Sequence, residues 1–278
     1  MTKPMLAYKV GAKEVDWTQE VFMQPKLDGV RCLISKDGAV SRTGKPWKNI
    51  EHILRKLKPF FKTHPNHILD GELYNHKLKN DFEKIISLVR KQKPTKADQL
   101  EARQMVQFHA YDCINQANKN YSARLFEMTS FGIYGKYIKL VFTEGVYQGE
   151  PEHARQINKR HLSEGYEGSI MRLDAPYEQK RSYNLQKWKD FHDDEATIIG
   201  YVDGKGKREG TLGKFLMQDD EGVEFGCPPG KGFTYKDLAD IQDNIHDYIG
   251  QHATFTYFER TKAGSYRHPM FKTLRNYE

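Results

Sequence analysis

One lysine lies where its amine could act as a nucleophile. The segment Lys26-Leu27-Asp28-Gly29-Val30-Arg31 follows a short apolar run that ends at Pro25, so we expect one strand to stop there and another to begin after Gly29. This break displays Lys26 beside a carboxylate, a glycine that allows close backbone approach, and a guanidinium. A lysine amine attacks phosphorus only when deprotonated, which neighbouring cations or partial burial promote. An exposed turn lysine would show the same pattern, so other segments must support this hypothesis.

Carboxylates and lysines further along the chain could serve phosphate and metal chemistry. Asp70-Gly71-Glu72 and Glu167-Gly168-Ser169 each place a carboxylate beside a glycine on an expected strand. Two such glutamates could bind a ribose hydroxyl and a metal ion, although solvated glutamates at strand ends would look the same. Lys187 and Lys189 are two residues apart, so on a strand they point to one side. Two aligned ammonium groups suit a triphosphate, and a plain amphipathic edge strand would show the same alternation.

The elements expected to position these residues are strands mixed with helices. The Asp37-Gly38 pair predicts a hairpin whose return strand carries Ser41-Arg42-Thr43. Apolar residues at helical spacing predict a helix that stops before Pro59 and a second helix over residues 82–89. Residues 91–97 are expected to form a basic, exposed connection. Further strands are expected over residues 67–74, 106–111, 140–143, 168–172 and 184–191.

A domain boundary is expected near residue 190. The charged run His192-Asp193-Asp194-Glu195 is interpreted as a linker and hinge, and five short strand candidates with glycine-rich turns follow it. One helix over residues 235–248 precedes the fourth of these strands. This pattern is typical of the OB-fold β-barrel, which commonly binds single strands and duplex backbones. The sequence therefore predicts an α+β chain: a domain of mixed, mainly antiparallel sheets with helices over 1–190, then an OB-fold domain over 191–278.

The order of these motifs resembles that of the ATP-dependent DNA ligases, a family of covalent nucleotidyltransferases. The matching segments are residues 26–31 (KxDGxR motif I), 41–43 (Ia), 70–72 (III), 111–112 (IIIa), 167–170 (IV) and 185–191 (V). Residues 259–261 and 264–271 resemble the end of the compact phage-type enzymes. The family's last motif often reads RxDK, whereas this chain ends Arg275-Asn276-Tyr277-Glu278, so the cation of the adenylation step is not identified.

The resemblance implies a catalytic role for three lysines. Lys26 would become the lysyl-adenylate, while Lys187 and Lys189 would neutralise the phosphates of ATP and then that of the migrating AMP. A larger set would surround the nucleotide: Gln24 at the adenine edge, Tyr111 stacked on adenine, Arg31 and Glu72 at the ribose, and Glu167 at the metal. Glu72 is the second metal candidate. Arg42 would bind the 5′-phosphate of a DNA nick through a bidentate contact.

The resemblance also implies the reaction and its partners. The first domain would be an adenylation domain, and the enzyme would seal 3′-OH/5′-phosphate nicks in duplex DNA with ATP and Mg²⁺, which Mn²⁺ could replace. Lys26 would take AMP from ATP, pass it to the 5′-phosphate, and the 3′-hydroxyl would then displace it. We expect a monomer that clamps nicked duplex DNA and acts in replication, repair and recombination.

Two alternatives share part of this pattern. An RNA ligase or a GTP-using capping enzyme also has the KxDG lysine and strand-borne glutamates, but the Arg267-His268-Pro269 segment favours a DNA ligase. Incorporation of ATP or GTP into the protein would separate these two. A non-catalytic OB-type DNA-binding protein with a degenerate upstream domain would require every filled motif position to be a coincidence.

Composition limits the classes of protein that remain possible. The 278 residues include 44 Lys+Arg against 37 Asp+Glu, and a net charge of +7 is typical of a polyanion binder. A hydrophobic content of 38% excludes wholesale disorder. No apolar stretch approaches the roughly 20 residues of a membrane-spanning helix, so we expect no membrane partner and a location in the cytoplasm of a bacterium or a phage-infected cell. Cys32, Cys113 and Cys227 lack the spacing of a disulfide framework or zinc knuckle.

Overall fold

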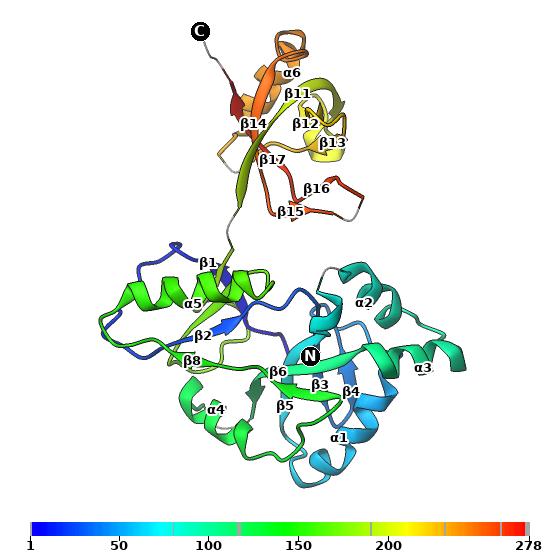
Figure 1. Ribbon diagram of the computed structural model, residues 1–278, viewed down its shortest axis with the longest axis vertical. Helices are drawn as coiled ribbons and strands as arrows, with labels where there is room; N and C mark the ends of the chain where they lie inside the picture. Colours follow the sequence, from blue (N-terminus) through cyan, green and yellow to red (C-terminus); the bar gives the residue numbers. More distant parts are fainter. Residues whose placement is uncertain are drawn as a thin grey trace. The chain divides into compact units, whose positions relative to one another are not determined.

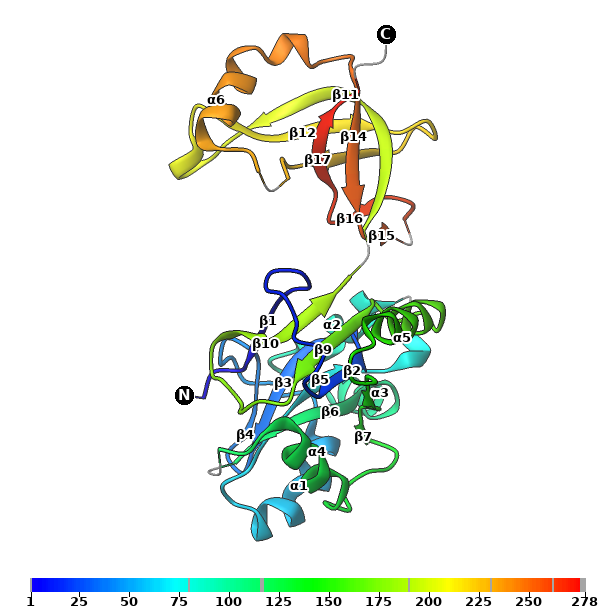
Figure 2. The same ribbon diagram turned by 90° about the vertical axis from the view of Figure 1, so that its left-hand side faces the viewer.

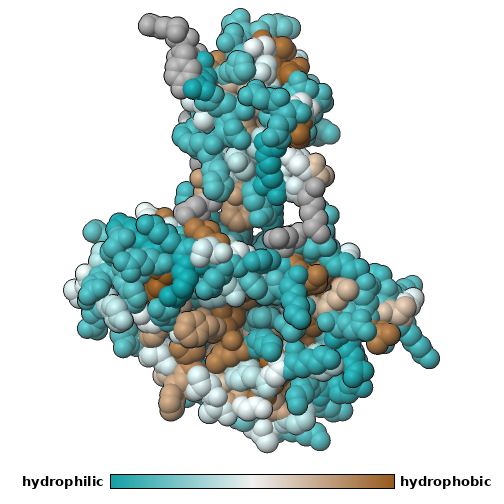
Figure 3. Space-filling model, viewed as in Figure 1, coloured by the Kyte–Doolittle hydropathy of each residue, from teal (hydrophilic) through white to brown (hydrophobic). Residues whose placement is uncertain are grey.

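The chain forms two compact units, Met1–Lys189 and Asp190–Glu278 (Figure 1). The structure is a computed structural model, and it describes residues 2–79, 81–115, 118–189, 191–230, 232–261 and 263–275. Among these residues, no helix combines the length and the apolar character that crossing a membrane requires. Most of the face drawn in Figure 3 is hydrophilic, in agreement with a mean hydropathy of −0.79.

Two five-stranded sheets make up the first unit (Figure 2). The first sheet has the order β1 (Leu6–Lys9), β10 (Arg181–Trp188), β9 (Ser169–Leu173), β2 (Val21–Pro25) and β8 (Glu144–Gly145). The second has the order β4 (Gly38–Val40), β3 (Val30–Ser35), β5 (Ile68–Tyr74), β6 (Gln107–Ile114) and β7 (Ile138–Leu140). One pair in each sheet is parallel, β1 with β10 and β6 with β7, and the other neighbours are antiparallel. The expectation of mixed, mainly antiparallel sheets is confirmed.

Helices cover these sheets and bury two apolar cores. They are α1 (Glu51–Thr63), the 3₁₀ helix η1 (His76–Leu78), α2 (Phe82–Val89), α3 (Lys96–Met105), α4 (Tyr121–Thr129) and α5 (Pro151–Ser163). The larger core packs α1 and its neighbours on the second sheet around fully buried Ile53, Leu57 and Phe108. A smaller core packs α5 on the first sheet through Ile157 and Met23. Both sheets are therefore rigid supports for the segments that connect them.

The second unit is a curved antiparallel sheet. Its order is β13 (Glu224–Cys227), β12 (Leu212–Gln218), β11 (His192–Asp203), β14 (His252–Tyr257) and β17 (Met270–Leu274). A bridge between Pro229 and Phe271 joins the segment after β13 to β17, so the two edges of the sheet meet. Shorter elements complete the unit: η2 (Gly206–Arg208), α6 (Tyr235–Asp243), η3 (Ile245–Asp247), β15 (Glu259–Arg260) and β16 (Tyr266–Arg267).

Two helices differ from the sequence-based expectation. Helix α1 does not stop before Pro59 but continues to Thr63. Proline removes one backbone hydrogen bond from a helix, and here the buried side chains of Phe60 and Phe61 outweigh that loss. Helix α3 begins at Lys96, inside the expected basic connection, because Thr95 and Asp98 form a capping box. The position of α5 was not predicted.

Three strand expectations also need correction. Ser41-Arg42-Thr43 form a turn after β4 rather than a return strand, and the Gly44 N–H donates to the Ser41 carbonyl at 2.9 Å. The strand expected over 140–143 is β7, which ends at Leu140. The charged run 192–195 is not a linker or hinge, because it lies in β11 and pairs with residues 254–257 of β14. The boundary residue Asp190 lies outside the described residues.

Candidate functional site

Lys26 lies where the chain crosses from one sheet to the other. Strand β2 ends at Pro25 in the first sheet, and β3 begins at Val30 in the second. The Lys26 N–H donates to the Gly168 carbonyl at 2.9 Å, and the Glu167 N–H donates to the Lys26 carbonyl at 3.1 Å. Gly168 has a φ of +127°, and a Cβ there would lie 2.1 Å from the Trp188 carbonyl oxygen. Only glycine fits this approach, so the backbone fixes Glu167 beside Lys26.

Glu167 forms ion pairs with two of the predicted catalytic lysines. One carboxylate oxygen contacts Lys26 Nζ and the other contacts Lys189 Nζ. The Glu167 side chain is 4% exposed, whereas the two lysines are 19% and 16% exposed. A buried carboxylate between two ammonium groups holds both amines at defined positions. The sequence predicted these three residues, but not that they would meet.

A cavity of about 260 Å³ opens beside Lys26. Its walls come from both sheets and include seven residues predicted from the sequence: Gln24, Lys26, Arg31, Arg42, Glu72, Tyr111 and Lys187. Glu167 adjoins the cavity because it forms an ion pair with Lys26. Lys189 adjoins it through a second ion pair with Glu167. Six of the lining side chains are lysine or arginine, because Arg172 and Arg181 also take part. Such a cavity suits an anionic ligand with an apolar ring system.

Glu72 is a carboxylate in this cationic cavity. It lies opposite Arg31 in the β3–β5 register, and the Tyr111 hydroxyl donates to its Oε2 at 3.3 Å. Burial raises the pKa of Glu72 to about 7, although the charges of Arg31 and Lys26 act in the opposite direction. Glu72 can therefore exist as an acid or a carboxylate near neutral pH.

Arg31 is held by an adjacent buried carboxylate. Its guanidinium makes a bidentate contact with Asp70 at 2.7 and 2.5 Å and also donates to the Met5 carbonyl at 3.1 Å. Asp70 accepts a further hydrogen bond from the Tyr177 hydroxyl at 2.6 Å. The guanidinium carbon lies 5.1 Å from the centre of the Tyr111 ring. Arg31 is thus fixed against the ring rather than free to rotate.

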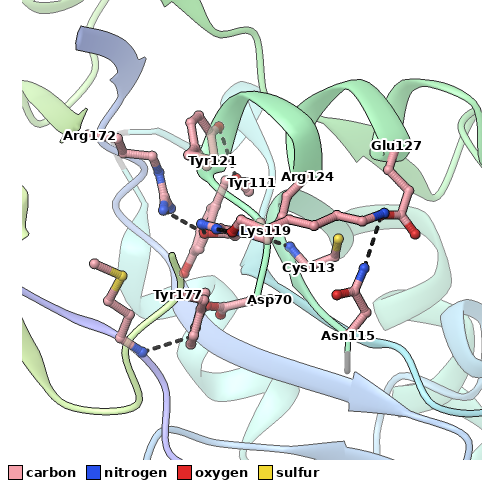
Figure 4. A network of polar contacts seen from close by, with 12 residues as sticks. Asp70, Tyr111, Cys113, Asn115, Lys119, Tyr121, Arg124, Glu127, Arg172 and Tyr177 are labelled. Carbon is pink, nitrogen blue, oxygen red and sulfur yellow. Dashed lines mark hydrogen bonds and ion pairs between the residues drawn. The ribbon is translucent and has the colours of Figure 1, made fainter. Parts of the chain in front are cut away.

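A second buried network supports Gln24 and Tyr111, and Figure 4 shows Arg172, Tyr111 and Tyr121 of this network. The Gln24 amide accepts from Arg172 at 2.7 Å and donates to the hydroxyls of Tyr121 and Thr143 at 2.8 and 2.9 Å. Arg172 also pairs with the fully buried Asp112 at 2.7 Å. The Arg172 guanidinium lies 5.5 Å from the centre of the Tyr111 ring. Both ends of the Gln24 amide therefore have protein partners.

The sequence reasoning missed Arg172 and Arg181. Arg172 is the one charged residue in the otherwise uncharged strand segment 169–173, and that isolated charge was an available signal. Arg181 begins the strand that carries Lys187, and its guanidinium donates to the Ala7 carbonyl at 2.5 Å. Arg42 reaches the cavity from the turn after β4. The C-terminal motif extends to residues 276–278, outside the described residues, while Arg275 forms an ion pair with Glu195.

The carboxylates near Lys26 allow one mode of metal binding. The described residues contain no group of three or more His, Cys, Asp or Glu that could hold an ion. Glu167 contacts Lys26 directly, and the Lys26 charge also acts on Glu72, so two carboxylates lie near the same amine. Mg²⁺ is commonly bound by one or two carboxylates together with substrate phosphates. Glu72 and Glu167 fit that mode.

A lysine in a cationic cavity between two sheets is the site of a nucleotidyltransferase. Comparison with known proteins identifies the family. A family model described as "ATP dependent DNA ligase domain" matches residues 4–189, and one described as "DNA ligase OB-like domain" matches residues 203–275. The chain belongs to the ATP-dependent DNA ligases. The predicted fold class, a nucleotidyltransferase domain followed by an OB-fold domain, is confirmed.

Several individual proteins are similar to this chain. A DNA ligase from Haemophilus influenzae is 27% identical over 252 residues, which cover 90% of this chain and 84% of that protein. A DNA ligase of African swine fever virus is 27% identical over 206 residues, so the chain spans about half (47%) of that relative's length. The solved structure of a Lig E DNA ligase has a TM-score of 0.81 at 22% identity and covers 99% of this chain and all of that one. That structure shares the fold.

Proposed function

We propose that this ligase seals 3′-OH/5′-phosphate nicks in duplex DNA, with Lys26 as its covalent nucleophile. The observation that carries the proposal is the placement of Lys26 at the cavity wall, with its amine held by the buried Glu167. In the first step Lys26 Nζ forms a bond to the α-phosphorus of ATP, and the bond from that phosphorus to pyrophosphate breaks. The AMP then passes to the 5′-phosphate of the nick, and the 3′-hydroxyl displaces AMP to close the strand.

Charge neutralisation and positioning supply most of the rate in such phosphoryl transfers. Glu167 orients the Lys26 amine and lies where it can accept the proton that Nζ loses. Lys187 projects into the cavity, where it would neutralise the phosphates of ATP. Lys189 contacts the other oxygen of Glu167. It would neutralise phosphate charge in both early steps, the adenylation of Lys26 and the transfer of AMP to the nick.

The remaining cavity residues would hold the nucleoside. Tyr111, whose ring is near Arg31 and Arg172, would stack on adenine. Glu72 and Arg31 would contact the ribose, and Asp70 keeps the Arg31 guanidinium in place for that contact. Gln24 would lie at the adenine edge and would orient Arg172, with which it shares a hydrogen bond.

A magnesium ion, when bound, would supply charge neutralisation at the phosphates. Glu167 and Glu72 are the residues that would hold it, and Mn²⁺ would substitute for it. Both oxygens of Glu167 contact lysines, Lys26 and Lys189, so the metal would share this carboxylate with them.

Nicked duplex DNA is the proposed partner of the chain, which we infer acts as a monomer. A net charge of +7 and an OB-like domain support binding to a polyanion. Arg42, at the cavity rim in the turn after β4, would grip the 5′-phosphate. We also propose a cytoplasmic location.

Labelling with α-labelled ATP and magnesium, read on a denaturing gel and chased with a nicked duplex, tests the proposal. The parent protein should take up label and release it when the nick is sealed. Lys26→Ala should take up none, and Lys26→Arg should fail as well because a guanidinium stays protonated. Lys36→Ala, at an exposed turn lysine, is the matched control and should label like the parent. Robust labelling of Lys26→Ala would reject the assignment, and labelling by GTP instead of ATP would favour the capping-type alternative.

A further inference from the structure

Two tyrosines stack on each other at the β1 edge of the first sheet. Tyr8 on β1 and Tyr183 on β10 have ring centres 4.0 Å apart and an interplanar angle of 6°. Tyr183 is 42% exposed, so part of its ring is accessible to a ligand. Parallel stacking restrains both rings, so this edge presents a preformed aromatic surface.

An irregularity in β10 places Tyr183 in this position. The β1–β10 register jumps from the pair Ala7 and Ser182 to the pair Tyr8 and Gln186. Side-chain hydrogen bonds hold the extra residues: the Asn184 N–H donates to Ser182 Oγ at 3.1 Å, and Gln186 Nε2 donates to the Tyr183 carbonyl at 3.2 Å. Three residues of β10 are therefore unmatched on β1, and such interruptions of a strand redirect side chains in the way that β-bulges do.

Cations flank the stack and connect it to the nucleotide cavity. The Arg181 guanidinium lies 5.6 Å from the centre of the Tyr8 ring, and Lys13 Nζ lies 5.9 Å from that of Tyr183. Ala7, which precedes Tyr8, and Arg181, two residues before Tyr183, both line the cavity. The aromatic and cationic surface is therefore continuous with the cavity wall.

The opposite edge of the same sheet provides a contrast. Tyr147, just after β8, stacks on His153 with ring centres 4.1 Å apart at 12°, and it is 64% exposed. There the histidine lies 3.7 Å from the carboxylate of Glu144, which also forms an ion pair with Arg160. The two edges thus carry similar aromatic stacks, and the stack at β1 has a guanidinium and an ammonium group near its rings.

We propose that Tyr183, supported by Tyr8, is a contact platform for a nucleotide of the nicked DNA strand, and that Lys13 binds a neighbouring phosphate. This rests on the proposed function, since it assigns part of the surface that receives the nicked duplex. Aromatic side chains beside cations are the combination that proteins use to bind nucleic-acid strands without reading their sequence. Tyr183 is not among the described residues that line the cavity, so the platform adjoins the ATP site without forming part of its lining.

The first test measures affinity for a 5′-phosphorylated nicked duplex whose 3′ end is a dideoxynucleotide, which prevents sealing. Tyr183→Leu should bind at least about 5-fold more weakly, whereas Tyr183→Phe, which keeps the ring, should stay within about twofold of the parent. Tyr147→Leu removes the matched stack at the other edge and should also stay within about twofold. Affinity of Tyr183→Leu equal to that of the parent, or an equal loss in Tyr183→Phe or Tyr147→Leu, would overturn the platform.

The second test follows Lys13→Gln over a salt series. Loss of one phosphate contact should reduce the slope of log affinity against log salt by about 0.9. An unchanged slope would exclude the proposed phosphate contact of Lys13. Self-labelling with ATP should remain within about twofold of the parent in all four variants. Failure of the parent to label itself would contradict the proposed function, while the affinity comparison would still decide the platform.

Discussion

Two sets of ion pairs, one in each unit of the chain, lie in different environments. In the first unit, Asp112 has no exposed surface and pairs with Arg124 and Arg172, whose side chains are 3% and 4% exposed. In the second unit, Lys272 and Asp193 form a pair that is more than half exposed on both sides. Burying an ion pair costs desolvation energy that the attraction of the partners barely repays, whereas an exposed pair costs and gains little.

This difference indicates what each unit contributes. Asp112 fixes Arg172, Arg172 fixes Gln24, and both residues line the cavity, so these buried pairs of the first unit position part of the cavity wall. Preorganised charge of this kind stabilises a transition state without rearrangement during the reaction. Exposed charge on an OB-like unit instead suits association with a polyanion, which depends strongly on salt.

Removal of the second unit should have the largest effect. A chain that ends at Lys189 keeps every described residue that lines the nucleotide cavity. We expect it to lose nick sealing by about a hundredfold or more, because the phosphate contacts of the OB-like unit are gone. Self-labelling should also fall steeply, whereas sealing of a pre-adenylated nick should persist in part. Charging with ATP as fast as the full chain would show that the second unit takes no part in the first step.

Loss of the buried carboxylate should be the next largest effect. Asp112→Asn leaves two buried guanidinium groups without a counter-charge, so unfolding should become easier by roughly 3–5 kcal/mol. For a unit of this size, the melting temperature should fall by roughly 6–20 °C in calorimetry. Asp193→Asn is the exposed counterpart and should change stability by less than about 1 kcal/mol. Similar losses in both variants would remove the distinction between the units.

The segments that line the cavity could be located from the sequence because each has a local signature. Strand β2 and strand β3 were found from an apolar run, a proline and a glycine, and the two glutamates from the glycines beside them. Contacts that depend on register were beyond local patterns: Gln24 meets Arg172 only because β2 pairs with β9, and Arg31 meets Asp70 through the β3–β5 register. A sequence pattern indicates which face of a strand a side chain occupies. It does not indicate which other strand pairs with that strand.

The same limit explains the two largest local errors. Helix α1 passes Pro59 because Phe60 and Phe61 pack into a core assembled from distant strands. The charged run 192–195 looked like a linker because its partners, among them Lys272 and Arg275, lie about 80 residues away. The sheet brings Lys272 and Arg275 beside the run, so charged side chains of β11 form ion pairs with them.

Arg42 allows a sharper test of the division within the first unit. It lies on a turn at the cavity, and we assign it to the nick's 5′-phosphate rather than to ATP. Arg42→Ala should therefore label itself with ATP normally but bind a 5′-phosphorylated nick about 10- to 100-fold more weakly, the loss expected for a charge-assisted contact. Binding to a nick with a 5′-hydroxyl should hardly change. An equal loss on both nicks would indicate a general contact with the DNA backbone.

The effect of Glu72 should be confined to the pH dependence of stability. Its pKa rises from 4.5 to about 7 in the folded protein because burial disfavours the carboxylate. Between these two values the folded state holds a proton that the unfolded state has released, so this group's contribution to stability falls as the pH rises from 4.5 to 7. Glu72→Gln stays neutral and should remove that decline.

The measurement is the free energy of unfolding from urea titrations at pH 5 and pH 8, in the absence of nucleotide and metal. Relative to the parent, Glu72→Gln should gain more stability at pH 8 than at pH 5, because only at the higher pH does the parent carry the buried charge. Asp37→Asn, at an exposed turn of the same unit, is a control that should leave the difference between the two pH values unchanged. An equal change in the free energy of unfolding of Glu72→Gln at pH 5 and at pH 8 would contradict this prediction. It would mean that Arg31 and Lys26 already keep Glu72 ionised throughout this range. The cavity would then hold one more permanent negative charge than we infer.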